Sequence, residues 1–282
     1  MARELRGKPV ADAICEGLVP RIEALASRGV IPTLAIVRVG NREDDLSYER
    51  AAIKRCEGLG IAVRNYVLPD SCTQEDLLAA VTEINQDSTI HGCLIFRPLP
   101  SHLDDEELCE TLLSSKDIDG ITPGSIFGVF ANEAIGFPPC TAAACIEVLK
   151  YYGVALEGAR VAVVGRSMVV GKPVSMMLQV ENATVTMCHT RTRDLPAECQ
   201  AADILVVAAG HIGTVGASAV RAGQTVIDVG INWCEEDQKL VGDVAYDEVE
   251  PIVDAITPVP GGVGSVTTAI LASHTVKAAE CL

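Results

Sequence analysis

Residues 161–173 read VAVVGRSMVVGKP and carry the clearest indication of the fold. An apolar run ends in Gly165, and a helix is expected to begin near Gly171. A strand, a glycine turn and a helix in this order form the phosphate loop of a Rossmann domain, where glycine lets the backbone approach a pyrophosphate and the helix N-terminus offers free N–H groups. The spacing is Gly-x-Ser-x-x-x-Gly rather than Gly-x-Gly-x-x-Gly, so an ordinary tight turn is the alternative.

The next expected strand, at 183–188, bears on which dinucleotide would bind. It is followed by His189-Thr190-Arg191-Thr192, with no acidic residue. NAD enzymes place an Asp or Glu there to bind the ribose 2′-hydroxyl. Arg191 and Arg166 instead carry guanidinium groups, which suit a 2′-phosphate. The pattern favours NADP over NAD, and the alternative is that Arg191 is a solvated surface charge.

Strand and helix patterns alternate on both sides of this turn, which predicts parallel α/β architecture. The segment Lys116–Phe137 is rich in Gly and Pro and is predicted to be an irregular loop between two domains, with Thr141 capping a helix that ends near Tyr151. Strands are predicted at 33–39, 61–68, 91–96, 160–165, 183–188, 203–208, 225–229 and 253–257, and helices at 43–59, 73–86 and 263–279.

Composition narrows the class of protein. The 282 residues carry a formal net charge of −16, which opposes nucleic-acid binding. The eleven cysteines are scattered without Cys-x-x-Cys spacing, so we expect free thiols, a cytoplasmic location and no metal site. The first seven residues lack the apolar core of a signal peptide, and no apolar run reaches membrane-spanning length.

Six segments then appear in a characteristic order. They are KDIDG at 116–120, PPCT at 138–141, the run VVGRSMVVGKPVSMML, the strand TVTMCHTRT, VIDVGIN at 226–232 and TPVPGGVG at 257–264. Together they resemble the bifunctional methylenetetrahydrofolate dehydrogenase/methenyltetrahydrofolate cyclohydrolases, from about residue 4 to residue 280.

The resemblance implies two domains separated by a cleft. Residues 1–138 with 265–282 would form an α/β domain for folate binding and catalysis, and residues 139–264 a Rossmann-type domain for NADP. The family oxidises 5,10-methylenetetrahydrofolate with NADP, hydrolyses the methenyl product to 10-formyltetrahydrofolate, and commonly forms homodimers. The implied catalytic residues are Tyr48 and Asp119. The implied substrate ligands are Tyr48, Asp119, Pro260, Gly261 and Gly262, and the implied cofactor ligands are Gly165, Arg166, Ser167, Gly171, Thr190, Arg191 and Ile231.

Two positions depart from the family pattern. Its catalytic helix carries Tyr-x-x-x-Lys, whose side chains share a face, but here Tyr48 is followed four residues later by Ala52. Phe96 stands where the family has a glutamine that hydrogen-bonds this lysine. Arg55 lies on the same helix face, but a guanidinium does not act as a general base. We therefore expect dehydrogenase activity with weak or absent cyclohydrolase activity.

Two other functions fit the same residues. One is a non-catalytic regulator that binds folate and NADP through Tyr48, Asp119 and the phosphate loop. The other is an NADP oxidoreductase for a different substrate, with a pocket rebuilt by Phe96, Arg97 and Ser265.

Overall fold

The computed structural model describes residues 1–281. Within it the chain forms two compact units. The six-stranded unit contains Met1–Ala11 and Thr141–Thr267, and the three-stranded unit contains Asp12–Cys140 and the residues from Thr268 onward. Both contain parallel sheets flanked by helices, which confirms the predicted α/β class.

The three-stranded unit is built around one fully buried strand. Its sheet has the order β3-β2-β4, with β2 at Thr33–Val39, β3 at Ala62–Leu68 and β4 at Gly92–Ile95, all parallel. Every residue of β2 is buried, as expected for a central strand covered on both faces. The three strands lie where the alternation predicts them.

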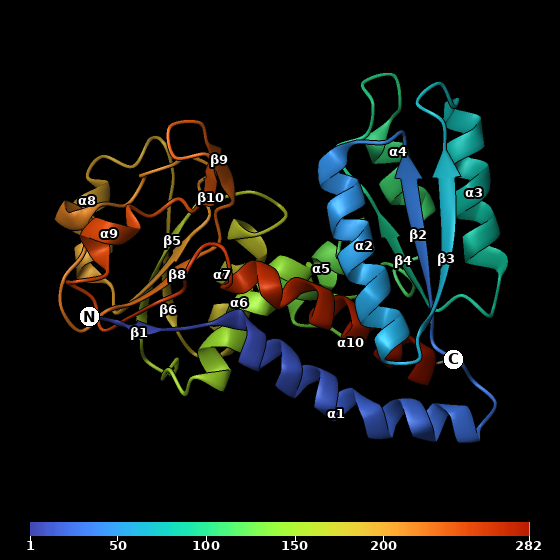
Figure 1. Cartoon of the computed structure of the whole chain (residues 1–282), viewed down its shortest axis with the longest axis horizontal. Coiled ribbons are helices and arrows are strands. Elements are labelled where there is room, and N and C mark those ends of the chain that lie inside the picture. Colours follow the sequence, from blue (N-terminus) through green and yellow to red (C-terminus); the bar gives the residue numbers. More distant parts are fainter. Residues whose placement is uncertain (282) are drawn as a thin grey trace. The chain divides into compact units, whose positions relative to one another are not determined.

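Alternate residues of β2 face different helices. Ala35, Val37 and Val39 belong to one core with residues of α3 (Gln74–Gln86). Arg38, on the opposite face, bonds to Glu49 of α2 (Glu43–Gly58). Figure 1 shows α2 and α3 on either side of this sheet. This arrangement fixes which side of α2 is turned inward.

The prediction of an irregular loop over Lys116–Phe137 is wrong for the middle of this segment. Residues Pro123–Ala131 form helix α5, which follows the short helix α4 (Asp105–Thr111). Thr122 caps α5 by accepting from the Ser125 amide, Pro123 occupies the first turn, and Asn132 ends the helix in the left-handed conformation. Proline is favoured at the first helical position, so here the Gly and Pro residues mark a helix start and not only a loop.

The predicted cap at Thr141 is also wrong. Helix α6 runs from Cys140 to Tyr151, so Thr141 lies inside its first turn. The remaining long helices are α1 (Gly7–Ser27) and α10 (Thr267–Glu280). The predicted last helix begins later than Val263 because Val263–Ser265 form a 3-10 turn.

The six-stranded unit has the order β1-β11-β8-β7-β5-β6, with every neighbouring pair parallel. Its strands are β1 (Arg3–Glu4), β5 (Arg160–Val164), β6 (Thr184–Cys188), β7 (Ile204–Val207), β8 (Thr225–Asp228) and β11 (Ala255–Ile256). Its shorter helices are α7 (Gly171–Val180), α8 (Leu195–Ala201) and α9 (Tyr246–Val249). The antiparallel hairpin of β9 (Asn232–Cys234) and β10 (Lys239–Val241) is separate from this sheet.

The N-terminus differs from the expected division into residues 1–138 with 265–282 and residues 139–264. Arg3 and Glu4 pair in parallel with Ala255 and Ile256, so the first residues extend the six-stranded sheet. Two-residue strands carry too short a pattern to be recognised in the sequence.

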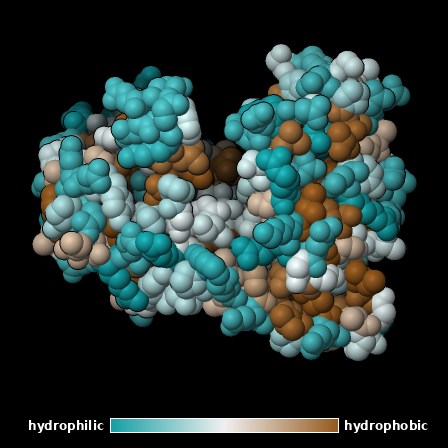
Figure 2. Space-filling view, in the orientation of Figure 1, coloured by the Kyte–Doolittle hydropathy of each residue, from teal (hydrophilic) through white to brown (hydrophobic). Residues whose placement is uncertain are grey.

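The cysteines, the surface and the helices of residues 1–281 bear on the expectations drawn from the composition. All eleven cysteines are free thiols, and eight of them are buried. Hydrophilic residues cover much of the face seen in Figure 2. Across residues 1–281, no helix combines the length and apolar character needed to cross a membrane.

Candidate functional site

The turn after β5 requires glycine at two positions. Gly165 has φ +136°, and an added Cβ would lie 2.2 Å from the Ala208 carbonyl oxygen. A Cβ on Gly171 would lie 2.3 Å from the Gly165 carbonyl oxygen. The start of α7 therefore packs directly on the end of β5. Such close backbone packing is what a phosphate-binding turn needs.

Ser167 organises the turn between these glycines. Its Oγ accepts from the Val170 amide at 3.1 Å and, more weakly, from the Gly171 amide at 3.5 Å. Helix α7 begins at Gly171, as the sequence predicts. The Arg166 side chain is exposed beside this helix start. Backbone N–H groups at a helix start together with an arginine suit an anionic group.

The turn after β6 lies at the neighbouring strand end, because Val164 of β5 pairs with Cys188 of β6. The His189 amide donates to Thr192 Oγ1 at 2.8 Å, and the Arg191 amide donates to His189 Nδ1 at 3.1 Å. These bonds fix the turn and leave Thr190 and Arg191 exposed. Arg166 and Arg191 thus follow the carboxyl ends of adjacent parallel strands.

Two buried aspartates that the sequence analysis missed support the loops after β7 and β8. Asp243 Oδ2 accepts from the amides of Ala209 at 2.6 Å and Gly210 at 2.8 Å. Asp228 accepts from three amides, those of Gly230, Asp243 and Val244. Burial raises the pKa of Asp228 to about 6. A signal existed in the acid that ends the apolar strand TVID, although its partners lie far along the chain.

The remaining residues assigned by resemblance to this unit lie in loops, and all but Gly262 are exposed. Ile231 is 62% exposed and lies between β8 and β9. Pro260 and Gly261 are exposed, and the Gly261 carbonyl accepts from the Gly7 amide at 2.8 Å. Gly262 is buried, and a Cβ on Gly7 would lie 2.0 Å from its carbonyl oxygen. The first turn of α1 therefore holds the Gly261–Gly262 segment.

Tyr48 and Phe96 meet within the three-stranded unit. Their ring centroids are 6.1 Å apart in an edge-to-face arrangement, a favourable geometry for aromatic pairs. Phe96 directly follows β4, and Tyr48 lies on α2. Ala52, one turn after Tyr48, is fully buried. An aromatic ring thus contacts Tyr48 where the family has an amide side chain.

Two charged side chains on the same helix as Ala52, those of Arg55 and Glu49, have bonding partners. Arg55 is partly buried, and its Nε lies 3.4 Å from Thr268 Oγ1 and its Nη1 3.6 Å from Cys15 Sγ. Glu49 accepts from Arg38 Nε at 2.7 Å, and both side chains are about 8% exposed. Arg55 therefore ties α2 to α10 and α1.

Asp119 lies at the start of helix α6. Its Oδ1 accepts from the Cys140 amide at 3.2 Å. Burial of the carboxyl group raises the pKa of Asp119 to about 6, despite this hydrogen bond, which lowers it. The residue keeps partial exposure. A carboxylate that is poorly solvated binds a complementary hydrogen-bond donor strongly.

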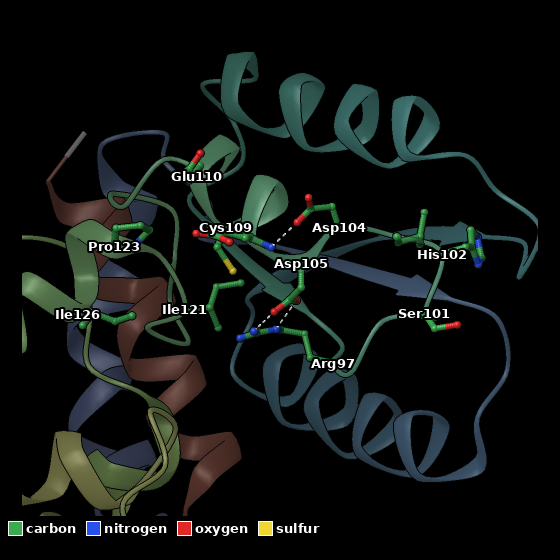
Figure 3. A pocket seen from close by; sticks show the side chains of 12 residues that line it. Arg97, Ser101, His102, Asp104, Asp105, Cys109, Glu110, Ile121, Pro123 and Ile126 are labelled. Carbon is green, nitrogen blue, oxygen red and sulfur yellow. Dashed lines mark hydrogen bonds and ion pairs between the residues drawn. The ribbon is translucent and has the colours of Figure 1, made fainter.

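A cavity of about 720 Å³ lies in the same unit. Arg97, Asp105, Cys109 and Ile121 are among the residues around it, and Asp119 is not. Figure 3 shows Arg97 and Asp105 pointing toward each other, with Arg97 Nε donating to Asp105 Oδ1 at 2.6 Å and a second bond from Nη2 to Oδ2. No cluster of metal-binding side chains occurs among residues 1–281.

Comparison with known families covers both units. Residues 5–119 match the catalytic domain, and residues 139–282 the NAD(P)-binding domain, of tetrahydrofolate dehydrogenase/cyclohydrolase. A bifunctional protein FolD of Carboxydothermus hydrogenoformans is 52% identical over 100% of this chain and 99% of its own length. The chain belongs to the tetrahydrofolate dehydrogenase/cyclohydrolase family.

Other members of this family are similar to this chain over nearly its whole length. A bifunctional protein FolD of Clostridioides difficile is 48% identical over 98% of this chain and 96% of its own. The FolD structure from Campylobacter jejuni is 38% identical with a TM-score of 0.96, covering 100% of this chain and 99% of that one. The FolD of Trypanosoma brucei, solved with NADP and an inhibitor, is 34% identical with a TM-score of 0.93, covering 99% and 98%.

Proposed function

We propose that this protein oxidises 5,10-methylenetetrahydrofolate to 5,10-methenyltetrahydrofolate with NADP. The observation that carries the proposal is that the chain matches both domains of the family while keeping Tyr48 and Asp119. The names of the Campylobacter jejuni and Trypanosoma brucei relatives describe enzymes, which favours catalysis over a regulator without turnover. They also favour a folate over an unrelated substrate.

NADP is the proposed cofactor because the residues around the glycine turn suit it. Gly165 and Gly171 allow a close backbone approach that a Cβ would prevent, and Ser167 shapes the turn between them. Arg166 and Arg191 follow adjacent strand ends, where no acid competes for a 2′-phosphate. The related Trypanosoma brucei enzyme binds NADP. Bound NADP supplies the acceptor for the hydride.

The side chains of the three-stranded unit then have to bind and orient the folate. The Asp119 carboxylate is suited to accept two hydrogen bonds from a 2-amino pyrimidinone ring. Tyr48, held edge-on by Phe96, offers an aromatic face and a hydroxyl near the proposed reacting carbon. Hydride loss leaves a cation stabilised by the folate's own nitrogens, so orientation is the main requirement.

Hydrolysis of the methenyl product makes a different demand. Water must lose a proton as it attacks, and a ring nitrogen must gain one, which calls for a general acid–base group. Ala52 and Phe96 supply none, and the nearby Arg55 guanidinium remains protonated. We therefore propose that hydrolysis is the slower activity. The relatives' names favour two activities and lend no support to a missing one, so this part of the proposal rests on those side chains alone.

The proposal is tested by supplying purified protein with 5,10-methylenetetrahydrofolate and either NADP or NAD. We expect NADPH to form at a rate that depends on protein concentration, with NAD as the poorer acceptor. Folate and NADP binding without NADPH formation would favour the regulator. NADP binding without folate binding would favour an oxidoreductase for another substrate.

We also propose a homodimer formed through the six-stranded unit and a cytoplasmic location. Trp233 and Leu240 are cross-strand partners on the β9–β10 hairpin and are 51% and 40% exposed. Large exposed apolar pairs are typical of interaction surfaces. The buried free thiols suit a reducing compartment. Sedimentation should give twice the chain mass, and Trp233→Glu should lower it; a monomeric wild type would contradict the dimer.

A further inference from the structure

His274 lies in α10, a helix that the proposed reaction does not otherwise use. It is 9% exposed. Its Nδ1 lies 2.8 Å from the Ile118 carbonyl oxygen, which belongs to the residue before Asp119. A carbonyl oxygen only accepts, so Nδ1 carries the proton in this contact. Burial lowers the pKa of His274 to about 4, so the ring is neutral near neutral pH.

A second donor reaches the same carbonyl. Cys140 Sγ lies 3.3 Å from the Ile118 oxygen and 3.8 Å from His274 Nδ1. The Cys140 amide also donates to Asp119 Oδ1. Burial raises the pKa of Cys140 well above its usual range, so the group is a thiol with a proton to donate. His274 and Cys140 therefore converge on the peptide that leads into Asp119.

The Ile118 side chain is fixed from the other side. Ile118 is fully buried, and a Cβ added to Gly92 of β4 would lie 2.7 Å from its Cγ2. The Phe137 ring packs on His274 with centroids 5.0 Å apart. Ile118 is thus held by the sheet through its side chain and by α10 and α6 through its carbonyl. Little freedom remains for the backbone that aims the Asp119 carboxylate.

We propose that His274 is a positioning residue for folate recognition, acting through the Ile118 carbonyl to orient Asp119. This inference rests on the proposed function of Asp119. It assigns α10 a part in substrate binding through a contact inside the three-stranded unit. A histidine that only filled space would be replaceable by leucine, whereas this role requires a donor at the Nδ1 position.

The test compares His274→Leu with His274→Asn, because an asparagine amide nitrogen is placed like Nδ1 and can donate to the same carbonyl. Initial rates of NADPH formation are measured while each substrate is varied in turn. We expect His274→Leu to raise the KM for 5,10-methylenetetrahydrofolate roughly tenfold, since a buried carbonyl loses a partner, and to leave the KM for NADP unchanged. His274→Asn should restore the folate KM to within about twofold.

Two outcomes would overturn the role. One is a folded His274→Leu protein with the wild-type KM for folate, and the other is a folded His274→Asn protein as impaired as His274→Leu. If the wild-type protein forms no NADPH, both the proposed function and this role of His274 are refuted. If the wild-type protein is active, the variants test the role of His274 separately from the proposed function. If the leucine variant does not fold, the nitrogen NMR spectrum of wild-type His274 decides: a protonated Nδ1 is expected, and a proton on Nε2 alone overturns the contact.

Discussion

The Asp119 carboxylate accepts a hydrogen bond from the Cys140 amide at 3.2 Å. The residue proposed to bind the folate therefore also caps the start of helix α6. Negative charge at a helix N-terminus is favourable, but here it is offset by burial, which raises the pKa of Asp119 to about 6. The folded protein thus holds a carboxylate that is costly to ionise without a ligand.

Asp119→Asn separates binding from stability. We expect folate binding to be lost and NADP binding to be kept, because an amide can still cap α6 but no longer offers two acceptor oxygens. The pKa of Asp119 is raised in the folded state, so between pH ~4 and pH ~6 the folded state holds more protons and stability falls as pH rises. Above that window, the variant should gain roughly 1–3 kcal/mol.

Titration calorimetry measures the binding, and thermal unfolding below pH ~4 and above pH ~7 measures the stability. The stability gain should vanish at the acid end, where the wild-type carboxyl is protonated. An Asp119→Asn protein that binds folate as tightly as the wild type would refute the assigned role.

Restoring the two missing side chains should speed hydrolysis. Ala52→Lys with Phe96→Gln supplies an ammonium group and its amide partner, and we expect the methenyl hydrolysis rate to rise on the order of 10²-fold. Because the two groups act together, the product of the two single-variant rate gains should be smaller than the rate gain of the double variant. Ala52→Met with Phe96→Gln is the matched control, since it adds a similar stem without charge. Equal rates for the two double variants would contradict the explanation.

Arg191 is expected to discriminate between the dinucleotides. Arg191→Ala should raise the KM for NADP roughly tenfold or more, the effect of losing a charged hydrogen bond, and leave the KM for NAD unchanged. Arg193→Ala removes an exposed arginine two residues away and serves as the control. A similar loss for both cofactors, or for both variants, would show that Arg191 does not contact the 2′-phosphate.

Gly171→Ala should disrupt the phosphate turn, because its Cβ would lie 2.3 Å from the Gly165 oxygen. We expect a loss of about 1–3 kcal/mol in unfolding free energy and weaker NADP binding. Gly17→Ala, inside α1 with nothing within 4 Å of its Cβ, should be neutral or stabilise by about 0.5–1 kcal/mol. Denaturant unfolding compares them, and a neutral Gly171→Ala would argue against close packing at this turn.

The alternation of apolar runs predicts the longer strands and the start of α7, because these elements have a clear period and a glycine boundary. Short elements escape it: β1 depends on pairing with Ala255 and Ile256, and α5 depends on Thr122 capping a segment rich in Gly and Pro. At the site, the resemblance to the family singles out Tyr48, Asp119 and the absence of a lysine at Ala52. The sequence cannot reveal that His274 reaches the Ile118 carbonyl, since this contact spans 156 residues.

A full-spectrum time course with NADP and 5,10-methylenetetrahydrofolate tests the proposed oxidation and the slow hydrolysis together. We expect NADPH to grow while the methenyl band accumulates, because oxidation outruns hydrolysis in a chain with Ala52 and Phe96. NADPH growth with no methenyl build-up beyond that of a non-enzymatic hydrolysis control would contradict the slow hydrolysis, and no NADPH at all would contradict the proposed function.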